Sequence, residues 1–193
     1  MALGVIILVL IIVGVLLFLL VTYIVGIYNQ LIEIKVNIEK SWANIEILEK
    51  QRYDEIPKLI KICEGYMKYE KGTFEKITEA RTRFLDAKTP SQMAQAGSDL
   101  SGALKTLFAV SENYPELKAN DNFKQLQSRV SYLENQIADR REFYNESVAI
   151  FNTRIKQIPD ILIANMLKYT EKEMYKISAE EKVSPEIKFD IPK

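Results

Sequence analysis

The residue types that most often perform catalysis are nearly missing from this sequence. Its 193 residues include no histidine and a single cysteine, Cys63. Without histidine there is no Ser-His-Asp or Cys-His relay and no histidine-based zinc site. Cys63 cannot form an intramolecular disulfide, and it falls among apolar residues at helical spacing, so we expect it in a core. The sequence predicts no catalytic residue and no metal ligand.

Carboxylates and glycines also fail to form recognisable cofactor sites. Helical di-metal sites combine glutamates with Glu-x-x-His pairs, which this chain lacks. No segment matches the phosphate-binding patterns G-x-x-x-x-G-K-[ST] or G-x-G-x-x-G. The 26 basic residues are balanced by 26 acidic residues, whereas nucleic-acid-binding proteins usually carry a basic surplus. We therefore expect no cofactor and no nucleic-acid partner.

One set of polar side chains is nevertheless expected to meet inside the fold. The apolar stripe of the first soluble helix has a gap at Arg52. If residues 28 and 120 lie at the same level, a rise of about 1.5 Å per residue brings residues near 88 and 144 to the height of Arg52. The predicted polar layer consists of Arg52, Asp86, Arg140, Arg141, Tyr144 and Asn145. It is either a pocket for a ligand or partner, or a buried layer that fixes helix register, and we favour the second because such layers are common in bundles.

The helices that position these residues follow from the spacing of apolar side chains. After residue 28, steps of three and four dominate, which is the period of an amphipathic helix. The pattern predicts helices over 28–69, 73–113 and 121–158, the second as one leg with a break near Pro90, and a shorter helix over 161–177. Thr89-Pro90-Ser91-Gln92 has the form of a capping box. The predicted fold is all-α: an antiparallel up-and-down helical bundle of three long legs plus a shorter fourth helix.

The amino-terminal stretch has the composition of a membrane anchor. The first charged residue is Glu33, and the uncharged run from Leu3 to Ile27 exceeds the about 20 helical residues that cross a bilayer core. A cleaved signal peptide is the alternative, but the stretch lacks a basic start and an Ala-x-Ala site. We expect a retained transmembrane helix that continues into the first helix of the bundle.

Flanking lysines predict the orientation of this anchor. Lys35, Lys40 and Lys50 follow it, and no basic residue precedes it. The positive-inside rule then puts the short amino terminus outside and the bundle in the cytoplasm, as in a single-pass protein of the plasma (inner) membrane. The expected domains are the anchor over 1–27, a cytoplasmic helical bundle over 28–178 and an extended or disordered tail over 179–193.

Several short motifs occur along the chain, and their combination is specific. They include Gln51-Arg52-Tyr53, Ile56-Pro57, Gly65-Tyr66, Ala80-Arg81, Tyr114-Pro115-Glu116-Leu117-Lys118-Ala119-Asn120 and Arg141-x-x-Tyr144-Asn145. In this combination the sequence resembles the LemA family, from the anchor to about Ala164. The resemblance implies a single-pass bacterial or archaeal membrane protein with a helical bundle, and it supplies no reaction. It offers association with membrane-protease or envelope-stress machinery as a lead, and it marks the family-motif loop (Tyr114, Pro115, Leu117 and Lys118) as a candidate site.

These observations together predict a membrane-anchored interaction or scaffold protein without catalytic activity. The expected partners are the lipid bilayer, through residues 1–27, and a protein of unknown identity. Self-association of the anchor is a further option, because Thr22 and Gly26 form a small-residue pair. The alternatives are an enzyme based on carboxylates or Arg and Tyr groups, and a small-ligand sensor, each with a site between helices. An enzyme needs a concave site with converging titratable groups.

Overall fold

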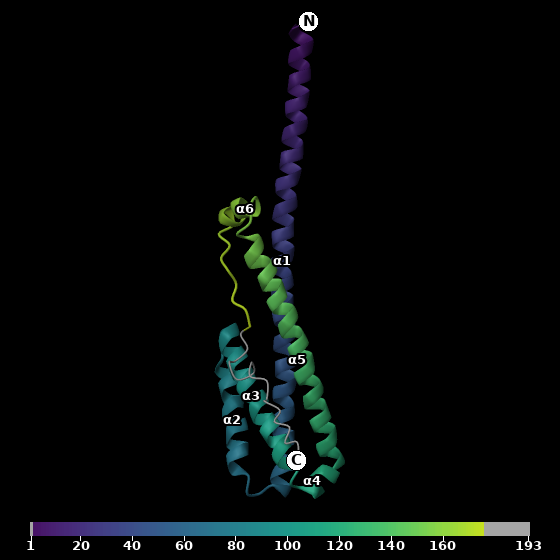
Figure 1. Cartoon of the computed structure of the whole chain (residues 1–193), viewed down its shortest axis with the longest axis vertical. Coiled ribbons are helices and arrows are strands. Elements are labelled where there is room, and N and C mark those ends of the chain that lie inside the picture. The colour runs from purple at the N-terminus through teal and green to yellow at the C-terminus, as the bar shows by residue number, and fades with distance from the viewer. Residues whose placement is uncertain (1, 176–193) are drawn as a thin grey trace, which may run out of the picture. The chain divides into compact units, whose positions relative to one another are not determined.

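A computed structural model of the chain describes residues 2–175, and all regular secondary structure in that range is helical (Figure 1). The described helices are α1 (Ala2–Tyr66), α2 (Lys71–Asp86), α3 (Pro90–Ser111), α4 (Pro115–Ala119), α5 (Asp121–Arg154) and α6 (Asp160–Met166). The all-α prediction is confirmed. The expected tail over 179–193 lies outside the described residues.

The chain divides into two compact units, and α1 and α5 each contribute to both. Unit 1 comprises Met1–Ser41 and Glu146–Lys172. Unit 2 comprises Trp42–Asn145 and Glu173–Lys193. All the candidate site residues named above belong to unit 2.

In unit 1, the first part of α1 presents an apolar surface that the described protein does not cover. The large apolar side chains between Leu3 and Val25 are exposed. Among the described helices, α1 is the one long and apolar enough to cross a membrane, and its most apolar stretch is 0% buried. Leu31, Val148 and Phe151, further along α1 and in α5, are by contrast buried. The uncovered stretch is therefore suited to a lipid environment.

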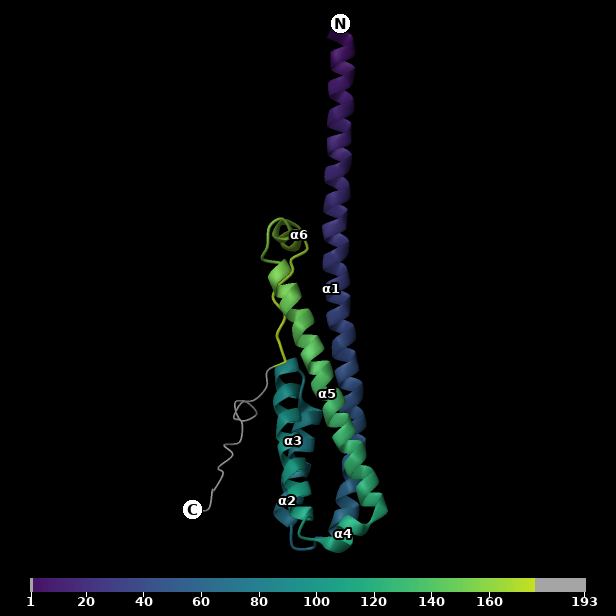
Figure 2. The same cartoon turned by 45° about the vertical axis from the view of Figure 1, so that its right-hand side comes forward.

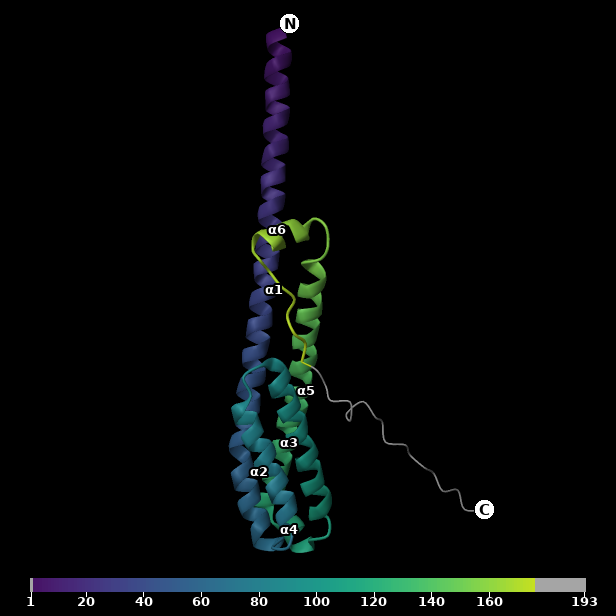
Figure 3. The ribbon, with the colours of Figure 1, turned by 90° about the vertical axis from the view of Figure 1, so that its left-hand side faces the viewer.

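Unit 2 is an antiparallel bundle of four helices: the second part of α1, α2, α3 and the first part of α5. Figures 2 and 3 show α2 and α3 side by side, as expected for helices joined by a three-residue turn. The antiparallel course of α1 and α5 follows from their contacts. Asn120, just before α5, binds Tyr66 at the end of α1, whereas Arg141 further along α5 reaches back to Glu49.

The core of unit 2 is formed by the inward-facing apolar residues of all four helices. Figure 1 shows how α4 connects α3 to α5 at one end of this bundle. Thirteen buried residues form one contiguous cluster: Ile56, Leu59, Cys63, Met67, Phe74, Ile77, Ala80, Leu100, Leu104, Leu107, Leu117, Phe123 and Val130. Burial of this apolar surface is the main driving force for the fold.

The predicted leg over 73–113 is instead a pair of antiparallel helices, and the reason lies in the residues between them. Thr89 caps α3: its side chain accepts from the Gln92 backbone, and the Gln92 side chain accepts from the Thr89 backbone. This confirms the predicted capping box. α2 ends at Asp86, and both Ala87 and Thr89 have extended backbone, the conformation that a following proline favours at Thr89. The chain reverses over this three-residue connection. Apolar spacing predicted both helices but not the reversal.

The last helix is also shorter than predicted, since α6 ends at Met166 and not near residue 177. Lys168 has a positive φ of 54°. Its backbone donates to Asn165 O at 3.1 Å, and that of Tyr169 donates to Ala164 O at 2.9 Å. These two bonds make a Schellman motif, which ends a helix with one left-handed residue. Glycine usually fills that position, and the sequence has lysine there, so the end was not visible in the pattern.

Candidate functional site

Arg52 is the centre of a buried group of charges in unit 2. Its side chain is 0% exposed, and its guanidinium forms ion pairs with Glu49 in the same helix and with Glu134 of α5. Nη1 also donates to Ser101 Oγ of α3 at 2.9 Å, and Nη2 donates to Gly97 O at 3.5 Å. One side chain thus joins α1, α3 and α5.

The charges of this group balance. Glu49 accepts from Arg52 through Oε2 and from Arg141 through Oε1, the latter at 3.1 Å. Two carboxylates, Glu49 and Glu134, therefore face two guanidiniums. Burial by itself lowers the pKa of Arg52, but the charges of Glu49 and Glu134 raise it above its ordinary value. Arg52 stays charged, and the cost of burying it is offset by its partners.

Tyr175, the last described residue, inserts its ring into this group. Its side chain is buried, and the Arg141 guanidinium carbon lies 4.4 Å from the ring centroid. The hydroxyl is 3.5 Å from Glu49 Oε1 and 3.4 Å from Met93 O of α3. Burial raises the pKa of the Tyr175 phenol above its ordinary value, so the ring remains neutral and can donate its proton.

The main chain around Tyr175 is held by side chains of α5. Asn145 Nδ2 donates to Tyr175 O at 2.9 Å, and Asn145 Oδ1 accepts from Tyr175 N at 2.7 Å. Tyr144 donates its hydroxyl proton to Glu173 O at 2.9 Å. An asparagine amide offers the same donor and acceptor as a peptide group, so it pairs with extended backbone as a neighbouring strand would.

The same arrangement occurs in unit 1, where Asn152 of α5 holds Lys172. Asn152 Nδ2 donates to Lys172 O at 2.9 Å, and Oδ1 accepts from Lys172 N at 2.8 Å. Each unit thus contains one asparagine of α5 whose side-chain amide pairs with both backbone groups of a residue in the segment that follows α6.

Two further residues shape the space that the ring fills. Trp42 of α1 lies with its ring centroid 6.3 Å from that of Tyr175 and 5.4 Å from that of Tyr144. A Cβ atom built on Gly97 would lie 2.8 Å from Arg141 Nη2, 3.0 Å from the Tyr175 hydroxyl and 3.1 Å from Glu49 Oε1. A side chain at position 97 would therefore require the end of the Arg141 side chain to move and would crowd the Tyr175 hydroxyl and Glu49.

The structure brings four of the six predicted layer residues together: Arg52, Arg141, Tyr144 and Asn145. Asp86 and Arg140 lie on the exposed surface, so their assignment to the layer is corrected. The error came from treating 73–113 as one leg, which put residue 120 level with residue 28. Asn120 instead donates to the Tyr66 hydroxyl, at 3.1 Å.

Glu49, Ser101, Glu134 and Tyr175 belong to the site and were missed. Counted from the Tyr66–Asn120 contact, Arg52 lies fourteen residues back along α1 and Glu134 fourteen residues forward along α5. Equal helical rise puts both at the same height. The register would have identified Glu134, but no local signal connects Tyr175 to the bundle.

The family-motif loop consists of Tyr114, Pro115, Leu117 and Lys118. Its members close the end of unit 2. Tyr114 donates to Glu70 Oε1 at 3.1 Å, across to the connection between α1 and α2. Pro115 begins α4, Leu117 is fully buried in the core, and Lys118 forms an ion pair with Glu112. These contacts fix the connection between α3 and α5.

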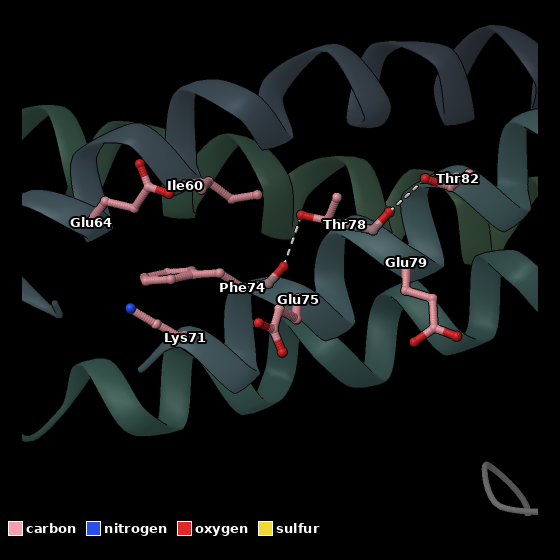
Figure 4. A pocket seen from close by; sticks show the side chains of 8 residues that line it. All are labelled: Ile60, Glu64, Lys71, Phe74, Glu75, Thr78, Glu79 and Thr82. Atoms are coloured by element: carbon pink, nitrogen blue, oxygen red, sulfur yellow. Dashed lines mark hydrogen bonds between the residues drawn. The ribbon is translucent and has the colours of Figure 1, made fainter. Parts of the chain in front are cut away.

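A separate groove runs between α1 and α2 on the surface of unit 2 (Figure 4). Its volume is about 570 Å³, and its lining residues are Ile60, Glu64, Lys71, Phe74, Glu75, Thr78, Glu79 and Thr82. Both threonine hydroxyls donate to carbonyl oxygens of their own helix, Thr78 to Phe74 O at 2.9 Å and Thr82 to Thr78 O at 3.0 Å. The groove therefore offers apolar contact and carboxylates, with its hydroxyls already occupied.

Metal and thiol chemistry receive no support from the described residues. Within 2–175, no group of three Cys, Asp or Glu side chains is placed to hold a metal ion. Cys63 is fully buried, and burial raises the pKa of its thiol to about 12. A thiol in that state is a poor nucleophile.

Comparison with known proteins identifies a family and several relatives of this chain. Residues 41–189 match the LemA family. Protein LemA of Metamycoplasma hominis is 27% identical over 163 residues, which cover 82% of this chain and 73% of that protein. Magnetosome protein MamQ 2 of Paramagnetospirillum magneticum is 24% identical over 158 residues, 68% of this chain and 58% of that protein. The magnetosome protein MamQ of Magnetospirillum gryphiswaldense is 22% identical, with the same coverage.

The chain thus spans less than two thirds of the length of the magnetosome proteins. None of these names describes a reaction. The family match covers most of the chain, including α2 to α6 and Tyr175. This chain belongs to the LemA family.

Proposed function

We propose that this protein is a membrane-anchored helical bundle that binds another protein, as an interaction or scaffold protein and not as an enzyme. The observation that supports the proposal most directly is the composition of α1 along its length. One unbroken helix begins with an uncovered apolar stretch and continues into a bundle with a complete core. The bilayer is the first partner, through residues 1–27, and the bundle is what the anchor holds at the membrane.

The arrangement of the titratable groups favours binding over chemistry. The groups that converge in unit 2 are Glu49, Arg52, Glu134 and Arg141, and they are paired with one another. Glu49 and Arg52 are closed to solvent. A general base must reach the proton of a substrate, and the Glu49 carboxylate is not accessible to one while Tyr175 occupies the space beside it. The groove between α1 and α2 is open and is the better surface for a partner.

We further propose that the protein is a single-pass protein of the plasma (inner) membrane with its bundle in the cytoplasm. Lys35, Lys40 and Lys50 support this orientation. It can be tested with Gln125→Cys, since Gln125 is exposed and the native Cys63 is buried. A membrane-impermeant maleimide should label this chain in inside-out vesicles and not in spheroplasts. Labelling in spheroplasts would reverse the orientation.

Site-specific photocrosslinking in intact membranes tests the interaction itself. A photoreactive amino acid at Glu75, in the groove, should give a discrete protein adduct. The matched position is Gln125, exposed on α5, where we expect no such adduct. An adduct whose mass equals two copies of this chain would identify self-association as the interaction. Absence of any adduct at Glu75 and at neighbouring groove positions, in chains that reach the membrane, would refute the groove as the surface that binds a protein partner.

A small-ligand sensor is the second candidate, and the same groove favours it. Ile60 and Phe74 line it with apolar surface, and about 570 Å³ is enough for a small molecule. In that case a small molecule should copurify with the chain and raise its thermal unfolding temperature. Replacing Phe74 by aspartate should abolish the copurification, whereas copurification that survives would place the ligand elsewhere.

A further inference from the structure

The segment that ends at Tyr175 is attached to unit 2 by very few side chains. Residues 170–174 are exposed, and Tyr175 is the one buried residue among 170–175. Residues 170–175 form no helix, and the hydrogen bonds and ring contacts that join residues 173–175 to α1, α3 and α5 involve the Tyr175 side chain and the backbone of residues 173 and 175. The segment therefore resembles a bound peptide with one buried anchoring side chain.

The backbone contacts do not depend on the sequence of the segment. Asn145 binds the N–H and the C=O of residue 175, and Tyr144 binds the C=O of residue 173. Any extended segment presents one N–H and two C=O groups at this spacing, provided that the residue in the place of Tyr175 is not proline, which has no N–H. This part of the site recognises extended main chain in general.

The ring contacts, by contrast, select tyrosine. The guanidinium of Arg141 lies over the ring, and any aromatic side chain could make this cation–π contact. The hydroxyl lies next to two acceptors, Glu49 Oε1 and Met93 O. The site therefore favours a ring that carries a hydrogen-bond donor, which is tyrosine and not phenylalanine. Gly97 leaves room for that tip. With the ring in place, the Glu49 carboxylate is buried and the Arg141 side chain is 12% exposed.

We infer that unit 2 carries a binding site for an extended protein segment that bears a tyrosine. The site is formed by Trp42, Glu49, Gly97, Arg141 and Asn145. The chain's own residues 173–175 occupy it, and a tyrosine-bearing segment of another chain binds there in their place. The inference goes beyond the proposed groove, because it concerns a different surface of unit 2, and it rests on the proposed function only in that the partner is a protein. Intramolecular docking and binding in trans exclude each other at this site. A partner segment gains access when the chain's own segment leaves.

Trp42 provides a direct readout, because it is the one tryptophan in the sequence and its ring lies 6.3 Å from that of Tyr175. Tyr175→Pro in the full chain removes both the ring and the N–H that Asn145 binds, which empties the site. We expect this variant to change the Trp42 emission. A synthetic peptide of residues 168–178, which contains no tryptophan, should restore the emission in a saturable manner. The same peptide with alanine at position 175 should bind about tenfold more weakly or worse.

Matched variants locate the binding. In the Tyr175→Pro background, Asn145→Ala should abolish the response to the tyrosine peptide. Asn135→Ala, an exposed asparagine on the same helix, should leave it unchanged. Tyr175→Ala serves as a second chain in case the proline variant fails to fold, since it retains the backbone contacts. A folded chain that ignores the tyrosine peptide at millimolar concentration, or responds equally to the alanine peptide, would overturn the inference.

A mixing experiment distinguishes the two sources of the segment. Donor chains carry Trp42→Phe, which removes their signal, and Gly97→Leu, which blocks their own site while Tyr175 stays intact. If these donors restore the emission of Tyr175→Pro chains, a second copy supplies the segment. If only the free peptide does so, a second copy is excluded as the source of the segment. Either result supports the site, and neither depends on the crosslinking result at Glu75, so the two proposals can fail separately.

Discussion

The guanidinium of Arg52 in α1 lies against the carboxylate of Glu134 in α5, across a separation of 82 residues in the sequence. Both residues are fourteen positions from the contact between Tyr66 and Asn120 that sets the register of the two helices. The ion pair therefore reports that register. Buried polar pairs of this kind are known to select one alignment of packed helices among several of similar apolar fit.

Removing Arg52 should be strongly destabilising. Arg52→Ala leaves Glu49 and Glu134 near one another without the cation between them, and we expect a loss of about 3–5 kcal/mol. Urea unfolding of the full chain in detergent, followed by circular dichroism, measures it. Arg83→Ala is the control, because Arg83 is 55% exposed and its pairs with Glu79 and Asp99 should contribute less than about 1 kcal/mol. Equal losses in the two variants would contradict the central role of Arg52.

Two glycines of α3 should respond in opposite directions to alanine. Gly97→Ala puts a methyl group 2.8 Å from Arg141 Nη2, so we expect destabilisation by about 1–3 kcal/mol. Gly102→Ala meets nothing within 4 Å and should stabilise by up to about 1 kcal/mol through helix propensity. Urea unfolding followed by circular dichroism measures both changes in stability. If both substitutions stabilised the chain, the ring would not be packed against position 97.

High pH should release the segment that carries Tyr175. Burial raises the pKa of this phenol above its ordinary value of 10.0, with Arg141 and Arg52 opposing the shift and Glu49 adding to it. A raised folded-state pKa means that the docked state is fully stable below pH 10 and loses stability as the pH rises above it, because the released phenol ionises more readily. Trp42 emission should therefore change above pH 10.

Two substitutions separate this effect from other titrations. Tyr175→Phe has no phenol to ionise and should flatten the change. Tyr144, whose pKa burial also raises, lies 5.4 Å from Trp42, so Tyr144→Phe measures its share. A pH profile that is identical in the wild type and Tyr175→Phe would show that docking does not depend on the neutral phenol.

The single cysteine should be inert in the folded chain. Burial raises the pKa of Cys63 to about 12, which leaves almost no thiolate at neutral pH. Maleimide labelling followed by mass spectrometry should detect no adduct without denaturant and a full adduct in urea. Gln125→Cys should be labelled in both conditions. Rapid labelling of Cys63 in the folded chain would mean that the core around Ile56 and Leu59 opens readily.

The end of α6 offers a test of backbone conformation. Lys168 has φ of 54°, a region where glycine is tolerated without steric cost. We expect Lys168→Gly to slow hydrogen exchange at the Tyr169 amide, which is bonded to Ala164 O at 2.9 Å. Lys172→Gly, outside the helix end, should not do so. Faster exchange in Lys168→Gly would argue against the Schellman motif.

The sequence by itself determined the helical class, the long apolar amino-terminal stretch and several helix ends. These features depend on neighbouring residues, because a helix needs only a period of three to four and a cap such as Thr89. The family-motif residues were visible for the same reason. Arg52 could be recognised as buried because it interrupts an apolar stripe, and its burial is confirmed by the structure.

Only the tertiary structure decided which residues surround Arg52. Whether residues 73–113 fold as one leg or as a pair changes the register of α5 against α1, and no local pattern measures that choice. The long-range contact between Tyr66 and Asn120 decides it, and the resulting register brings Glu134 to Arg52 in place of Asp86. The docking of Tyr175 is still less local, since it joins the last described residue to α1, α3 and α5 through space. Long-range contacts are fixed by packing and register, which a single sequence does not express as a pattern.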